Sequence, residues 1–115
     1  MNIKIEKFHI YLADLNPQRG TEPGKMRPVV VIQTDLLNNV HPSTVVCPIT
    51  TNVQTEADLL RVHLKTAGAG LTKDSDILVD QVRAIDNRRF LKPLGKLTRL
   101  QAEKLTRNLR ILFLE

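Results

Sequence analysis

Most of the chain consists of short apolar or alternating stretches that are separated by residues typical of turns. Stretches of this length that are rich in Val, Ile and Leu predict β-strands. The segments predicted to form strands are residues 8–15, 27–33, 44–49, 59–64, 76–85 and 93–97. The segment 76–85 fits either one bent strand or a pair of strands. Thr34 and Asp35 precede two leucines and predict the start of a short helical turn.

The period of the apolar residues changes after residue 97. Thr98 and Gln101 have the spacing of a capping box, in which each side chain bonds to the backbone of the other residue. The apolar positions that follow at helical spacing are Ala102, Leu105, Leu109 and Leu112. Several short strands followed by one amphipathic helix predict a mainly β fold with a C-terminal helix, arranged as a small closed or half-closed β-barrel. The length of 115 residues predicts a single domain over residues 1–115.

Composition narrows the classes of protein further. Hydrophobic residues make up 42% and charged residues 25% of the chain, which is typical of globular proteins. The wholly apolar runs, such as Val29–Ile32, are far shorter than a membrane span, and no run of signal-peptide length follows Met1. The sequence therefore predicts a cytoplasmic protein that does not associate with a membrane.

The only cysteine, Cys47, excludes an internal disulfide. It lies in an apolar stretch, and we interpret it as a buried small hydrophobe rather than a nucleophile. The cysteine and the three histidines do not have the spacing of a metal site, so neither a metal nor a cofactor is expected.

Positive charge is concentrated near the end of the chain. The net charge is +5, and the segment 83–110 holds nine basic residues against two acidic ones. This surplus favours an anionic partner, nucleic acid first, although a basic face that binds only solvent is the alternative. Aromatic residues are only 3% of the chain, so contacts to nucleic acid are expected to rest on charge and hydrogen bonds rather than on stacking.

The stretch from Gly20 to Thr34 is the most informative part of the sequence. Gly20, Pro23 and Gly24 predict a loop whose backbone can approach a ligand closely. Arg27 follows this loop at the entrance of a β-branched strand. A guanidinium beside free backbone N–H groups suits phosphate or carboxylate. The alternative is a solvated arginine at the start of a strand.

Other polar residues also allow two interpretations. His9, His41 and His63 are isolated in the sequence, and each fits a solvated side chain better than a catalytic base. Thr50 ends a predicted strand and fits a residue that satisfies its own local turn. Glu22 fits either a substrate contact or an ion pair with a neighbouring cation.

Several short motifs follow one another along the chain. They are Asp14-Leu15-Asn16-Pro17, Gly20-Thr21-Glu22 with Gly24, Arg27-Pro28, Pro48-Ile49-Thr50-Thr51, Leu71-Thr72-Lys73-Asp74-Ser75, Asp80-Gln81-Val82-Arg83-Ala84-Ile85-Asp86, and Gly95-Lys96-Leu97 before the final helix. In this order they resemble the MazF/PemK family of toxins, over about residues 11–112.

This resemblance implies an SH3-like or CcdB/MazF-type β-barrel that pairs as a homodimer. It implies the toxin of a toxin–antitoxin pair, a sequence-specific and metal-independent endoribonuclease that cuts single-stranded RNA. The 2′-OH would attack the adjacent phosphorus, giving a 2′,3′-cyclic phosphate and a 5′-OH. The implied partner is a MazE-like antitoxin whose flexible acidic segment covers the RNA-binding surface.

The resemblance also implies roles for single residues. Its catalytic arginine and threonine correspond to Arg27 and Thr50. The residues implied to contact RNA are Gly20, Thr21, Glu22, Gly24, Asn38, Asp80 and Gln81. The chain departs from the family at Phe8-His9, where Gly-Asp is common, and at Pro23, which removes one N–H donor from the loop.

Two rival functions remain at this point. A gyrase poison of the CcdB family relies on a tryptophan near its C-terminus, and this chain contains no tryptophan. A non-catalytic basic module that binds RNA or a peptide fits the charge equally well.

Overall fold

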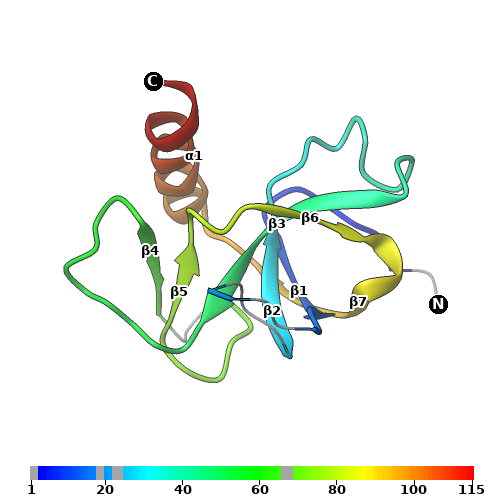
Figure 1. Cartoon of the computed structure of the whole chain (residues 1–115), viewed down its shortest axis with the longest axis horizontal. Helices are drawn as coiled ribbons and strands as arrows, with labels where there is room; N and C mark the ends of the chain where they lie inside the picture. Colours follow the sequence, from blue (N-terminus) through cyan, green and yellow to red (C-terminus); the bar gives the residue numbers. More distant parts are fainter. Residues whose placement is uncertain (1–2, 18–19, 22–24, 66–68) are drawn as a thin grey trace.

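The computed structural model describes residues 3–17, 20–21, 25–65 and 69–115. Its elements are β1 (His9–Asp14), β2 (Met26–Val31), β3 (Ser43–Thr50), β4 (Arg61–Leu64), β5 (Ser75–Leu78), β6 (Arg83–Asp86), the short 3₁₀ helix η1 (Asn87–Arg89), β7 (Phe90–Lys96) and α1 (Arg99–Leu114) (Figure 1). All strand pairs are antiparallel. The predicted class, mainly β with a C-terminal helix, is confirmed.

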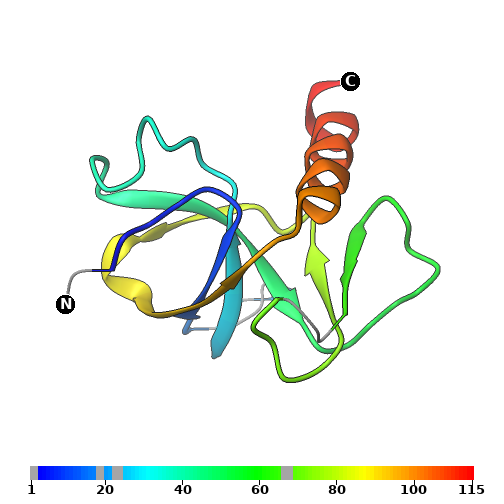
Figure 2. The same ribbon diagram turned by 180° about the vertical axis from the view of Figure 1, so that it is seen from behind.

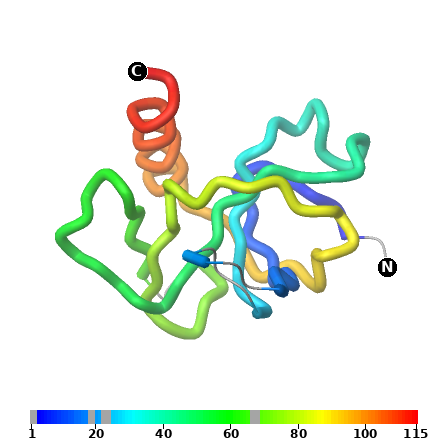
Figure 3. The backbone as a smooth tube through the Cα atoms, viewed as in Figure 1, coloured from blue at the N-terminus to red at the C-terminus, as the bar shows by residue number. Residues whose placement is uncertain are grey.

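The longest strand, β3, lies at the centre of the sheet. The strand order is β4-β5-β3-β2-β1-β7, and β6 also pairs with β3. Residues 43–46 of β3 pair with β6, whereas Ile49 and Thr50 pair with β5. Between β5 and β6 the chain therefore crosses from one half of β3 to the other. The backbone trace in Figure 3 shows this crossing. No pairing among the described strands joins β4 to β7, so hydrogen bonds leave the curled sheet open at these two strands.

Both faces of the central strands are buried. Val29 and Val31 of β2 pack with Tyr11 in one cluster, while Val30 packs with Leu105 of α1 in another. A strand that is covered on two faces requires apolar residues at every position rather than at every second one. This burial accounts for the β-branched run that the sequence shows at this point.

The helix α1 begins as the sequence predicts. The Thr98 hydroxyl accepts a hydrogen bond from the Gln101 N–H, and the Gln101 side chain accepts one from the Thr98 N–H. Buried Asn108 donates to the carbonyl of Asp58, which ties the helix to the segment before β4. Figures 1 and 2 both show α1 at the end of the molecule that holds β4 and β5. Among the described residues, no helix is long and apolar enough to cross a membrane.

Two predicted strands begin two or more residues from where the sequence places them. The predicted strand 59–64 begins only at Arg61, because Leu59 and Leu60 form an exposed turn. The predicted strand 93–97 begins earlier, at Phe90, and keeps Pro93 inside it. Proline removes a ladder donor, which an edge strand with irregular register tolerates, and β7 has two register shifts against β1.

The segment 34–41 forms hydrogen-bonded turns, and they begin with the short capped turn that the sequence predicts at Thr34 and Asp35. The Thr34 hydroxyl accepts from the Leu36 N–H, and its carbonyl accepts from the N–H groups of Leu37 and Asn38. The segment 76–85, for which one or two strands were expected, forms the separate strands β5 and β6.

The capping box predicts a local contribution to stability. We expect Thr98→Ala to lower the free energy of unfolding by about 1 kcal/mol, because the Gln101 N–H loses its acceptor. Denaturant unfolding monitored by circular dichroism measures this change. The matched control is Thr106→Ala, since the Thr106 hydroxyl only bonds back to the carbonyl of Ala102 within the helix. Equal losses for the two variants would contradict the capping role.

Candidate active site

Arg27 and Thr50 lie on adjacent strands. The β2–β3 register pairs Val29 with Pro48 and Val31 with Val46. Continued by two residues toward the loop, the same register brings Arg27 opposite Thr50. Directly opposite residues of an antiparallel pair point to the same face, with Cβ atoms about 4.5–5.5 Å apart. Both side chains are half-buried, and the continued register predicts that they lie on the same face at the end of the sheet.

The Thr50 hydroxyl already has a local partner. It accepts a hydrogen bond from the Asn52 N–H at 3.1 Å, which is the turn role that the sequence allowed. A hydroxyl also carries one hydrogen that it can donate. The local turn therefore fixes the oxygen while the O–H can still bond to an anionic oxygen of a ligand.

The base of the β1–β2 loop is held by hydrogen bonds. The Asn16 side chain accepts from the Lys25 N–H at 2.7 Å, and the Leu15 N–H donates to the Lys25 carbonyl. Arg89 donates to the carbonyls of Asp14 and Asn16. Arg27 thus follows a loop whose two ends are fixed to each other.

The loop itself is described only in part. Gly20 and Thr21 are exposed, and Gly20 has a φ of +55°, a conformation that favours glycine. The predicted contacts Glu22 and Gly24, together with Pro23, lie outside the described residues.

Asn38 is buried in the segment that follows β2. Its side chain is 3% exposed, accepts from the Gln33 amide, and donates to the Gln33 carbonyl and to Asp35. Both ends of its amide close the segment after β2, so Asn38 has a structural role, and its implied contact with RNA stays a prediction. Its position in the sequence could not reveal this burial.

Asp80 and Gln81 lie in the turn between β5 and β6. Asp80 is exposed and Gln81 is half-buried, and the Gln81 N–H donates to the carbonyl of Leu78. Both residues are therefore near β3, the strand that β5 and β6 flank, and both keep polar atoms within reach of a ligand.

Asp86, which ends the same motif, has a structural role. Its carboxylate accepts from the side chain and the N–H of Arg88 and caps η1. The Arg88 guanidinium lowers the pKa of Asp86 to about 2.

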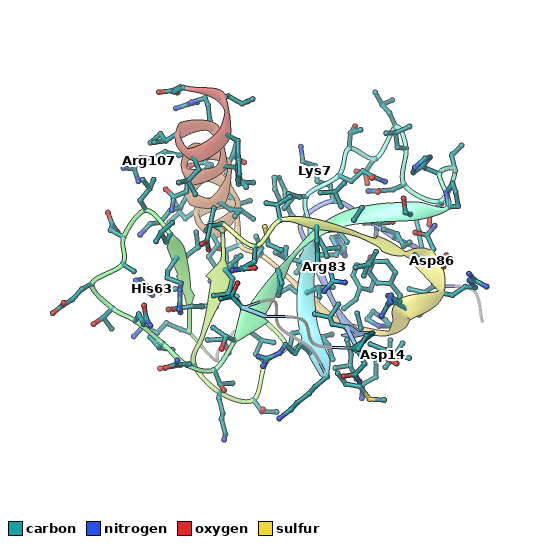
Figure 4. The ribbon with its side chains drawn as sticks, in the orientation of Figure 1. Lys7, Asp14, His63, Arg83, Asp86 and Arg107 are labelled. Carbon is teal, nitrogen blue, oxygen red and sulfur yellow. The ribbon has the colours of Figure 1, made fainter. Side chains whose placement is uncertain are left out.

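Arg83 shares a face of the sheet with Arg27 and Thr50. It pairs with Val46, which in turn pairs with Val31, so all lie on the side of the sheet that carries the odd residues of β2. Figure 4 shows Arg83 over the middle of the sheet between β6 and β2. The site face therefore carries a second guanidinium, which sequence reasoning did not place there.

A buried carboxylate lies beside Thr50. Asp76 pairs with Thr50 across β5 and β3, and with His63 across β5 and β4. Its side chain is completely buried and contacts His63 Nδ1 at 2.6 Å and Arg61 Nη1 at 3.0 Å. His63 is thus not the isolated, solvated residue that the sequence suggested. An aspartate inside a strand next to apolar residues was the available signal, because a buried carboxylate needs partners.

Cys47 is buried, as the sequence predicts. Burial, with a smaller effect of the Asp80 charge, raises the pKa of its thiol to about 12. Among the described residues, no three His, Cys, Asp or Glu side chains are grouped so that they could hold a metal ion.

Comparison with known proteins agrees with the fold and the motifs. Residues 6–113 match the family of PemK-like, MazF-like toxins of type II toxin–antitoxin systems. The chain belongs to this family. It is also a homologue of the endoribonuclease MazF of Staphylococcus epidermidis, with 38% identity over 101 residues that cover 88% of this chain and 82% of that protein.

Solved structures show the same MazF-like fold. MazF from Deinococcus radiodurans matches with a TM-score of 0.82 and 23% identity, covering 96% of this chain and 97% of that one. A MazE–MazF complex from the same organism matches with a TM-score of 0.76 and 22% identity, covering 96% of both chains.

The buried thiol gives a direct prediction. With a pKa of about 12, the native Cys47 thiol is about 10⁻⁴ ionised at pH 8, so we expect it to react with Ellman's reagent roughly 10³ times more slowly than in denaturant. The absorbance of the released thiolate measures both rates. Comparable rates in the native and unfolded protein would contradict the burial of this side chain.

Proposed function

We propose that this MazF-like toxin is a sequence-specific endoribonuclease that cleaves single-stranded RNA. The observation that supports the proposal most is the β2–β3 register, because its continuation toward the loop, which is held at both ends, would bring Arg27 opposite Thr50. RNA supplies its own nucleophile, the 2′-OH, so the reaction needs neither a metal nor a nucleophile from the protein. The products are a 2′,3′-cyclic phosphate and a 5′-OH.

The two aligned side chains suit the charge that develops in this reaction. Negative charge grows on the phosphoryl oxygens as phosphorus becomes five-coordinate. Arg27 offers parallel N–H donors to two of these oxygens, and the Thr50 hydroxyl donates to the same group. Gly20, Thr21, Glu22 and Gly24 are proposed to contact the RNA backbone and bases, together with Asp80 and Gln81.

The proposed partner is a MazE-like antitoxin with a flexible acidic segment. The related MazE–MazF complex supports this proposal, as does the positive surplus of residues 83–110. A groove of about 550 Å³ between the N-terminal segment, β7 and α1 supports it further. The charged residues that line the groove are Lys7, Lys96, Arg99, Arg107 and Arg110 against Glu103, with His9 beside them.

The proposed assembly is a homodimer. Large apolar side chains remain exposed in the turns after β2, where Leu36 is 86% and Val40 is 79% exposed, and at the end of α1. A second copy of the chain can cover such surfaces.

Light scattering tests the assembly. We expect a mass of about twice 13.0 kDa at micromolar concentration, because burying the exposed apolar side chains favours association. A single species of 13.0 kDa under these conditions would overturn the homodimer.

Cleavage of RNA tests the function. Purified protein incubated with a long single-stranded RNA in EDTA is expected to give discrete fragments with 5′-OH and 2′,3′-cyclic phosphate ends. Arg27→Ala is expected to lower the rate by about 10²–10³, the usual effect of losing one donor to a developing oxyanion. The measurement is the initial rate on gels with an end-labelled substrate.

The matched control is Lys4→Ala, which removes an equal charge from the exposed N-terminal segment, outside both the groove beside α1 and residues 83–110. The control is expected to cut at the wild-type rate. Equal rates for wild type and Arg27→Ala would refute the role of Arg27. Binding of RNA without any cut by the wild type would favour the non-catalytic module instead.

A further inference from the structure

Cleavage by the 2′-OH leaves one chemical task open. A proton must leave the 2′ oxygen as this oxygen attacks phosphorus. The Arg27 guanidinium keeps its proton at neutral pH, and a threonine hydroxyl is a very weak base. The two residues at the centre of the proposed site stabilise charge, but neither is suited to accept this proton.

The strand registers align a histidine with this site. Thr50 pairs with Asp76, and Asp76 pairs with His63, so the three side chains share one face on β3, β5 and β4. The continued β2–β3 register adds Arg27 on the other side of Thr50. The order across the sheet is Arg27, Thr50, Asp76 and His63, and we name these four residues the cross-strand row. Two strand spacings, about 9–10 Å, separate the backbones of Thr50 and His63.

Asp76 is fixed before any substrate binds. Its Oδ2 atom accepts from the Gln54 N–H at 2.8 Å and from Arg61 Nη1 at 3.0 Å. Its Oδ1 atom is 2.6 Å from Nδ1 of His63. The carboxylate therefore has one oxygen held by the protein frame and the other directed at the imidazole.

This contact determines the form of the imidazole. An ionised carboxylate only accepts hydrogen bonds, so the proton of neutral His63 lies on Nδ1 and the lone pair lies on Nε2. Asp76 is completely buried, whereas the side chain of His63 is 29% exposed. The part of the pair that a substrate can reach is thus the imidazole. Figure 4 shows His63 beside β4, at the end of the sheet that carries α1.

We propose that His63 is the general base of the RNA cleavage, and that Asp76 is its positioning residue. The inference rests on the proposed endoribonuclease function and assigns its missing proton acceptor. Nε2 of His63 takes the proton of the 2′-OH while the bond from the 2′ oxygen to phosphorus forms. The bond from phosphorus to the 5′ oxygen breaks, and the 5′ oxygen takes a proton from water. The imidazolium then returns its proton to solvent, which restores the neutral base.

Charged groups around His63 come from three elements. Asp76 lies on β5, Arg61 lies two residues before His63 on β4, and Asp58 precedes β4. Asp58 is paired with Lys104 of α1, which is the main reason that its pKa is lowered, and the charge of Arg107 on the same helix adds to this effect. The negative charge of Asp76 and the positive charge of Arg61 are thus fixed close to the imidazole.

The pH dependence of cleavage tests the inference. A general base acts only in its unprotonated form, so the wild-type profile is expected to have an acid limb in which the rate falls as the pH drops. His63→Gln is expected to lose about 10²-fold or more at neutral pH and to lose this acid limb of the profile. The matched control is His41→Gln, an exposed residue in a turn, which is expected to keep the wild-type rate and profile.

Two further measurements separate chemistry from structure. Affinity for an RNA in which every 2′-OH is replaced by 2′-O-methyl is expected to be equal for wild type and His63→Gln. Cleavage by His63→Ala is expected to recover in part when imidazole is added, since free imidazole replaces the missing base but no packing contact. A lost affinity, or no recovery with imidazole in a folded variant, overturns the catalytic role.

The possible failures are distinct. If the wild type cuts RNA and Arg27→Ala does not, but His63→Gln keeps the rate and the acid limb, only the role of His63 is overturned. If the wild type binds RNA without cutting it, the proposed function and this inference are overturned together.

Discussion

The register of β3 with β2 and with β5 determines which face of the sheet carries Thr50 and Asp76. Thr50 lies at the end of β3, between β2 on one side and β5 on the other. A shift by one residue would turn Thr50 toward the apolar cluster under α1 and bring Ile49 to the site face. Burial of Val29 and Val31 on one face, and of Ile49 and Ile77 on the other, opposes such a shift. The two hydrophobic clusters therefore fix the positions of the polar side chains of the site, although neither cluster contains these side chains.

Burial of the Asp76 carboxylate costs solvation free energy. An ionised group without water needs hydrogen bonds to both oxygens, and here the loop after β3 and two residues of β4 supply them. A buried ion pair contributes little net stability, but its geometry is demanding, so it favours one arrangement of β4 against β5. The helix supports the same arrangement, because Asn108 holds the segment that leads into β4. Packing of α1 against the segment before β4 thus helps to hold the cross-strand row in place.

Local patterns in the sequence predicted much of the fold, and distant pairings account for what they missed. The capping box at Thr98, the buried run of β2 and the burial of Cys47 follow from neighbouring residues alone. The order of the motifs was enough to predict the family, which the comparisons confirm.

The contact of His63 with Asp76 depends on the β4–β5 register, which no local pattern encodes. The burial of Asn38 likewise depends on Gln33 folding back over the turn. The start of β7 was missed because Pro93, which lies inside the strand, is a typical strand boundary in a sequence.

The central claim is that one phosphodiester of RNA sits between Arg27 and Thr50. A crystal structure with a short RNA that carries a 2′-deoxy nucleotide at the cleavage site tests it most directly. The account predicts the scissile phosphate within hydrogen-bond distance of both the Arg27 guanidinium and the Thr50 hydroxyl. An RNA bound on another face of the sheet, with both side chains facing only protein, would contradict the account.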